Sequence, residues 1–312
     1  MAEDNKYKNR RRNILILCMI GGASLLIRLL FHYNFERSAL LYVGIPFLIA
    51  VALLFIERPV QTQNWKRRYV NISVMSLVIM LGSSIVLFEG FVCVVMFMPI
   101  YFAILLLVFL FEGLARHRKK QRGKSYVQLL PLLILVTTFE GVVPEFSFER
   151  EYEVSKEKII SADVAAIKQQ LLQPIELNKS RNWLLSLFPM PYHISAETLK
   201  AGDIHTIDFI YHRWFFTNTH EGSMQLEISA VEENYIRTRF VNDTSYIANY
   251  LLLHGTEIKF EPLPNGQTKV SLKIAYHRFL DPVWYFGPVQ EYAVGAMAQF
   301  LLDEVVSPKV GV

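Results

Sequence analysis

The sequence predicts an α-helical membrane part of about five transmembrane helices (residues 1–146), followed by an α+β soluble part (residues 147–312). Three observations support this fold class. Apolar runs of helical length fill the first part, strands with alternating apolar and polar residues begin near residue 150, and the chain closes with helical periodicity. A chain of 312 residues is long enough for two such units.

Charge divides the chain at the same place. Residues 1–144 contain 17 Lys and Arg against 7 Asp and Glu, whereas the remainder contains 15 against 21. The basic excess therefore belongs to the membrane part, where membrane lipids with anionic head groups are the expected partner and nucleic acid is not. Both cysteines, Cys18 and Cys93, lie in apolar runs, so the soluble part has no thiolate for a disulfide or a metal.

Five apolar runs are expected to form the spans. They cover residues 13–33, 39–56, 70–87, 91–114 and 126–143. The third and fourth runs are almost continuous and together are too long for one helix across a hydrocarbon core of about 30 Å. A break at Phe88, Glu89 and Gly90 is therefore expected. The first run lacks a convincing cleavage site, which favours an uncleaved span over a signal peptide.

Positive charge alternates between the expected loops. Five Lys and Arg precede the first span, one follows it, four follow the second, none follows the third and six follow the fourth, in Arg116–Lys124. Because Lys and Arg mark the cytoplasmic side, we expect a cytoplasmic N-terminus in a bacterial plasma (inner) membrane. The soluble domain is extracytoplasmic if the short fifth run crosses, and cytoplasmic if that run lies in the interface.

A Phe-Glu-Gly triplet occurs three times, at residues 88–90, 111–113 and 139–141, each at the end of an expected span. Carboxylates inside a membrane are candidates for a proton or cation path. These three fall where the head groups begin, and their spacings of 23 and 28 residues are unequal. We interpret them as interfacial helix ends.

The soluble part begins with a strand expected at residues 152–160. Asp163 follows as a helix start for residues 164–172, and a second helical piece is expected at 176–187. The prolines of Phe188–Pro191 predict a turn.

Alternation then predicts antiparallel strands. They are expected at residues 204–216, 224–228, 235–241, 257–261 and 268–277. Asn265 and Gly266 lie between the last two, and both residue types tolerate positive φ, so these strands are expected to form a hairpin.

A long helix is expected at residues 282–306, with Asp281 as N-cap. Helical spacing gives it an apolar stripe of Ala293, Met297, Phe300 and Leu301.

This order of elements resembles that of the START-like superfamily, also called SRPBCC, which includes polyketide cyclases and dehydrases and Bet v 1-type ligand carriers. The resemblance covers residues 150–306 and is carried by Glu153–Ile160 with the turn Ser161–Asp163, the hairpin Ile258–Tyr276, and the helix from Asp281. It implies a helix-grip fold, in which an antiparallel sheet curves around the C-terminal helix and encloses a hydrophobic pocket. A multi-span anchor departs from the free-standing members.

Strand parity and helical spacing select candidate residues for this cavity. They are His205, Phe209, Tyr211, Arg213, Met224, Leu226, Tyr235, Arg237, Leu272, Tyr276, Tyr292 and Met297. No catalytic residue is assigned.

No metal site and no cofactor are expected. Six histidines lie in the soluble part, but His205 and His212, the nearest approach to a ligand pair, point to opposite faces of one strand. The sequence contains no glycine-rich phosphate loop, no nucleophile elbow and no His-Glu-x-x-His helix.

The resemblance implies a membrane-anchored domain that binds a hydrophobic small molecule or lipid near the bilayer surface. Two other functions stay open: a cyclase- or dehydrase-type enzyme in which Tyr and Arg polarise the carbonyl of a hydrophobic substrate, and a ligand sensor that couples to membrane partners. An apolar cavity favours a carrier or sensor, whereas converging polar groups favour an enzyme.

Overall fold

The computed structural model describes residues 37–56, 65–86, 91–119, 137–142, 147–172, 185–195, 198–214 and 217–307. These residues belong to two compact units. The first comprises Met1–Phe148 and Leu280–Tyr285, and the second comprises Glu149–Phe279 and Phe286–Val312. The sequence placed the boundary after residue 146, and in the structure the second unit begins at Glu149.

The first unit is helical. Its helices are a π-helical turn, Leu40–Gly44, then α2 (Ile45–Ile56), α3 (Trp65–Val86) and α4 (Phe91–Lys119). They bury an apolar core that includes Phe47 of α2, Ile72 of α3 and Leu105 of α4. The Tyr101 hydroxyl of α4 donates a hydrogen bond to Ser76 Oγ of α3 at 2.7 Å, which connects the two helices inside this core.

The expectation of five transmembrane helices is not supported. Among the described residues one stretch, Val94–Gly113 of α4, has the length and composition to cross a bilayer, with 20 residues and a mean hydropathy of 2.8. The apolar helical stretch Leu40–Val51 is shorter, and α3 carries Lys66, Arg67 and Arg68 in its first turn. The expected first span and most of the fifth lie outside the described residues.

The fifth expected span also differs in its described part. Thr137 is the last helical residue, and residues 138–142 form turns and an isolated bridge, with Gly141 at a φ of 77°. Glu140, which we expected at a membrane interface, is buried, and its carboxylate accepts a hydrogen bond from the Val283 backbone N–H at 2.8 Å. A tertiary partner therefore determines this turn, and apolar content alone does not reveal it.

Glu112 also differs from its interpretation as a helix end, because α4 continues to Lys119. Its carboxylate accepts hydrogen bonds from Arg68 Nη1 of α3 at 3.0 and 3.1 Å. The Arg68 side chain is buried, so the carboxylate compensates a charge that would otherwise be costly inside the helical core.

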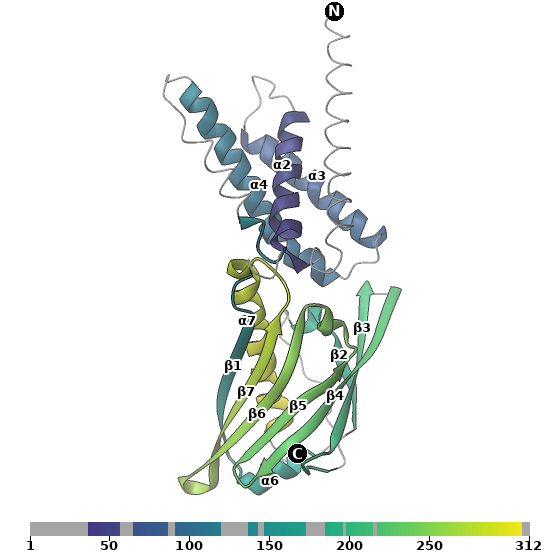
Figure 1. Ribbon diagram of the computed structural model, residues 1–312, viewed down its shortest axis with the longest axis vertical. Helices are drawn as coiled ribbons and strands as arrows, with labels where there is room; N and C mark the ends of the chain where they lie inside the picture. Colours follow the sequence, from purple (N-terminus) through teal and green to yellow (C-terminus); the bar gives the residue numbers. More distant parts are fainter. Residues whose placement is uncertain are drawn as a thin grey trace, which may run out of the picture. The chain divides into compact units, whose positions relative to one another are not determined.

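The second unit is built on one antiparallel sheet of seven strands. They are β1 (Glu151–Ile160), β2 (Met190–Ser195), β3 (Ile204–Trp214), β4 (Thr217–Glu232), β5 (Tyr235–Asp243), β6 (Leu251–Leu263) and β7 (Gln267–Arg278). The spatial order is β1-β7-β6-β5-β4-β3-β2, so the first strand pairs with the last. The sheet curves around the long helix α7 (Val283–Leu301), as Figure 1 shows. The predicted helix-grip fold is therefore confirmed for this unit.

Local sequence signals explain several elements. Asp163 caps the short helix α6 (Val164–Gln170), because its carboxylate accepts the Ala166 backbone N–H at 2.7 Å. Asn265 and Gly266 both have positive φ, at 72° and 69°, in the tight connection between β6 and β7. The predicted N-cap of the first helix and the predicted hairpin are confirmed.

Strand β2 was not expected, because the prolines of Phe188–Pro191 predicted a turn. In the structure Met190–Ser195 pairs with β3 as the edge strand of the sheet. Pro191 is accommodated there because an edge strand has one side free of ladder hydrogen bonds, and the register shifts directly after it.

The core of the second unit lies between α7 and one end of the sheet. Alternate residues of β7 are buried, from Thr268 to Arg278, and pack with β1, β6 and α7. Val294 and Ala298 of α7 belong to the same cluster, as does Leu302 of the π-helical turn Leu302–Val306 that follows it. The small side chain of Ala298 allows the helix to lie close to the strands.

Leu272→Ala is expected to destabilise the second unit by about 2–5 kcal/mol. The Leu272 side chain is 2% exposed, so its truncation leaves a cavity in the core. The matched control is Leu252→Ala on the neighbouring strand, where the side chain is 43% exposed and the expected change is within about 0.5 kcal/mol. Hydrogen exchange of β6 and β7 amides in the full-length protein measures both. Equal effects of the two substitutions would contradict this assignment of the core.

Candidate functional site

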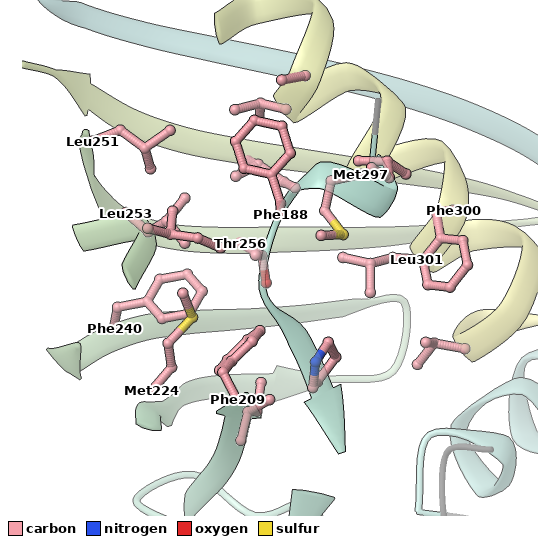
Figure 2. Close-up of a pocket in the computed structure, with 18 of the residues that line it drawn as sticks. Phe188, Phe209, Met224, Phe240, Leu251, Leu253, Thr256, Met297, Phe300 and Leu301 are labelled. Carbon is pink, nitrogen blue, oxygen red and sulfur yellow. The ribbon is translucent and has the colours of Figure 1, made fainter. Parts of the chain in front are cut away.

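A cavity of about 180 Å³ lies between α7 and the inner face of the sheet in the second unit. Figure 2 shows Met297 and Leu301 of α7 across from Phe240, Met224 and Phe209 of the strands. The full lining consists of Leu185, Phe188, Pro191, Ile194, Ile207, Phe209, Met224, Phe240, Ile247, Leu251, Leu253, Thr256, Ile274, Ala293, Val294, Met297, Phe300, Leu301 and Val305.

Two periodicities direct these residues into the cavity. Alternate residues of a strand share a face, so Ile207 and Phe209 of β3 both line the cavity. Residues three or four apart share a face of a helix, and the predicted stripe of Ala293, Met297, Phe300 and Leu301 lines the cavity in full. The predicted stripe therefore coincides with the side of α7 that faces the cavity.

Thr256 is the one polar residue among the described residues that line the cavity. Its hydroxyl lies 2.7 Å from the Thr238 hydroxyl of β5, and its backbone N–H donates to the same Thr238 oxygen at 3.1 Å. The hydroxyl thus already has a partner in the wall. Because the described lining contains no carboxylate, imidazole or thiolate, it holds no metal ligand and no general acid or base.

Three of the residues selected from the sequence line this cavity. They are Phe209 of β3, Met224 of β4 and Met297 of α7, and all three are labelled in Figure 2.

Three other selected residues lie on the same strands as Phe209 and Met224 but outside the lining. His205 is buried, and its Nε2 lies 2.7 Å from the Thr198 carbonyl oxygen. Tyr211 is buried and stacks on Tyr246 with ring centroids 4.5 Å apart. Leu226 is half-buried on β4.

Leu272 and Tyr276 belong to the core beside the cavity. Tyr276 is fully buried and stacks on Tyr152 with ring centroids 5.7 Å apart. Burial raises the pKa of the Tyr276 hydroxyl, with a smaller contribution from the charge of Glu291. The phenol therefore stays protonated near neutral pH and is unsuited to act as a base.

The remaining selected residues do not converge on the cavity. Tyr235 and Arg237 alternate with Ile236 and Thr238 and lie on the opposite face of β5, where both bond to Glu257. Arg237 is 55% exposed at the side chain. Tyr292 of α7 is 59% exposed. Arg213 lies in β3, but its side chain is outside what the structure describes.

Six of the lining residues that the sequence did not select come from two places. Phe188, Pro191 and Ile194 belong to or precede β2, the strand that was mistaken for a turn. Leu251, Leu253 and Thr256 belong to the first half of β6, where a bulge between Leu253 and Gly255 shifts the alternation by one residue. The sequence signal that could have identified this part of the lining was the presence of hydrophobic residues both before and after the bulge.

No model of a known protein family matches the sequence, and no curated protein matches it. Solved structures similar to the second half of the chain include a protein from Chromobacterium violaceum, at 15% identity and a TM-score of 0.33 over 50% of this chain and 98% of that one. A START superfamily protein from Mycobacterium smegmatis has 13% identity and a TM-score of 0.32, over 49% and 96%. An AHSA1-like protein from Aeromonas hydrophila has 10% identity and a TM-score of 0.30, over 52% and 99%.

Ala293→Phe is expected to fill the cavity from the α7 side and to weaken binding of an apolar fluorescent probe such as N-phenyl-1-naphthylamine at least tenfold, or about 1.4 kcal/mol. Ala165→Phe, the same substitution at an exposed position of α6, is the matched control and should bind as the wild type does. Fluorescence titration of the full-length proteins measures both. Unchanged affinity in Ala293→Phe would mean that the probe binds elsewhere.

Proposed function

We propose that the second unit binds a hydrophobic small molecule or lipid in the cavity under α7, and that the helices of the first unit anchor the protein in a membrane that supplies this ligand. The observation that carries the proposal is the apolar lining of the cavity, in which the one hydroxyl among the described residues is already bonded to Thr238.

The lining restricts the chemistry of the ligand. Each buried methylene group contributes about 0.8 kcal/mol to binding, so aliphatic or aromatic groups are favoured. A polar group without a partner in the cavity costs about 1–3 kcal/mol, and a charged group costs more. The ligand is therefore apolar over the part that enters, and any charged head group stays outside.

Membrane anchoring is supported by two features of the first unit. The apolar stretch Val94–Gly113 spans about 30 Å at 1.5 Å per residue, which equals the hydrocarbon thickness of a bilayer. Apolar side chains also remain exposed on one helix, with Val74 of α3 54% and Val78 64% exposed. Such side chains are stable against lipid and costly against water.

The chemistry of the cavity favours binding over catalysis of the cyclase type. A Tyr and Arg pair was the expected polarising group. Tyr276 lies in the core and Arg237 on the opposite face of the sheet, and the side chain of Arg213, the other candidate arginine, is outside what the structure describes. The described lining has no titratable group to replace them.

Hydrophobic compounds should co-purify with the full-length protein in mild detergent at close to one molecule per chain. Organic extraction followed by mass spectrometry should find the same compounds in Ala165→Phe and a depleted set in Ala293→Phe, because the Phe side chain occupies the cavity. Extracts that match the detergent background, or that are equal in both variants, would count against a binding function.

We further propose that the N-terminus is cytoplasmic and that the second unit lies on the extracytoplasmic side. In a chain with Cys18 and Cys93 replaced by Ser, Glu233→Cys places a thiol on the exposed turn between β4 and β5. A membrane-impermeant maleimide should label this thiol in intact bacterial spheroplasts. Labelling that requires permeabilised spheroplasts would place the domain in the cytoplasm and would leave the binding proposal intact.

A further inference from the structure

Two histidines and a glutamate from three strands converge on the outer face of the sheet, away from the cavity. Glu151 begins β1, His254 lies in β6 and His277 lies near the end of β7. His254 Nε2 lies 2.9 Å from one carboxylate oxygen of Glu151, and His277 Nδ1 lies 2.6 Å from the other. One ligand atom from each residue lies within 4.8 Å of those of the other two.

The register of the sheet builds this cluster. Glu151 and His277 are directly opposed in the antiparallel pair of β1 and β7. His254 is the extra residue of the β6 bulge, between Leu253 paired with Tyr276 and Gly255 paired with Ala275. The bulge requires glycine, because a Cβ at Gly255 would lie 2.2 Å from the Thr238 carbonyl oxygen.

The cluster differs from the other charged pairs between β1 and β7. Further along these strands Glu153 pairs with Lys273 at 2.6 Å and Glu157 with Lys269 at 2.9 Å. A protonated lysine has no lone pair for a metal, whereas neutral imidazole does. At Glu151 the partners of the glutamate are two imidazoles instead of a lysine. These three residues therefore form a set of potential metal ligands rather than a simple ion pair.

Two imidazole nitrogens and a carboxylate oxygen form a donor set that zinc and similar ions favour over Mg²⁺ and Ca²⁺. Such ions bind nitrogen and oxygen at about 2.0–2.2 Å, which places tetrahedral ligand atoms about 3.3–3.6 Å apart. The three side chains are 62% (Glu151), 45% (His254) and 28% (His277) exposed, so small rotations adjust their spacing and solvent reaches the remaining coordination position.

We propose that Glu151, His254 and His277 bind one divalent transition-metal ion of the zinc class, with water completing the coordination. The ion joins the first residue of edge strand β1 to β6 and β7, across sequence separations of 103 and 126 residues. It therefore acts as a cross-link that holds the start of the domain onto its sheet. This site is independent of the ligand in the cavity.

The test uses full-length protein, stripped of metal with a chelator and dialysed into buffer with mild detergent. Titration with Co²⁺ should produce visible d–d absorption that saturates at one equivalent, and Zn²⁺ should displace the Co²⁺ and abolish the absorption. His254→Gln, His277→Gln and Glu151→Gln should each weaken Co²⁺ binding at least tenfold, because each removes one of three ligands.

The matched control is His193→Gln. His193 Nδ1 lies 3.2 Å from an Asp208 carboxylate oxygen on β2 and β3, and this pair belongs to no cluster of three metal ligands among the described residues. The control should bind Co²⁺ as the wild type does. Circular dichroism and thermal unfolding in the presence of chelator establish that each variant is folded, and Zn²⁺ should raise the Tm of the wild type but not of His277→Gln.

Three results would overturn the proposal: no saturable Co²⁺ absorption in the wild type, equal affinity in the wild type and all three cluster variants, or an equal loss in His193→Gln. The wild-type titration decides the question even if a cluster variant fails to fold. Probe binding in the cavity is measured separately with Ala293→Phe, so failure of the metal site and failure of the ligand site are distinguishable.

Discussion

The packing of α7 against the inner face of the antiparallel sheet is the interaction on which the second unit depends. At one end of the sheet the packing is close, because Gly295 and Ala298 present little side chain to the strands. A Cβ at Gly295 would lie 3.5 Å from a Val154 methyl group of β1. At the other end, Phe209 of β3, Met224 of β4 and Phe240 of β5 line a cavity that α7 covers. The same helix therefore packs against a dense core at one end of the sheet and covers a cavity at the other.

The two faces of the sheet are separate, so the proposed ligand site and the proposed metal site lie on different surfaces of the domain. Residues that point inward surround the cavity, and the one hydroxyl among the described lining residues is bonded within the wall. Residues that point outward carry the charged pairs, which remain hydrated and cost little to maintain. The β6 bulge contributes to both faces: it brings Leu253 and Thr256 to the cavity and His254 to the outer face.

In the first unit, apolar composition predicts helices but does not predict how each helix ends. Helices α3 and α4 follow the expected runs closely, with Trp65–Val86 and Phe91–Lys119 against expected spans of 70–87 and 91–114. Arg68 lies in the N-terminal extension of α3, where its side chain is buried and paired with the compensating charge of Glu112. The turn at Glu140 depends on a backbone N–H at Val283, more than a hundred residues later, which no local pattern reveals.

The sequence by itself determined the order of elements in the second unit apart from β2, the Asp163 cap, the turn at Asn265 and Gly266, and the apolar stripe of α7. These features depend on residues close together in the chain, through alternation, helical spacing and tolerance of positive φ. Only the tertiary structure decided which inward-facing residues line the cavity and which fill the core, because Phe209 and Leu272 have the same local pattern. It alone brought Glu151, His254 and His277 together, since their proximity follows from strand order and a bulge rather than from spacing.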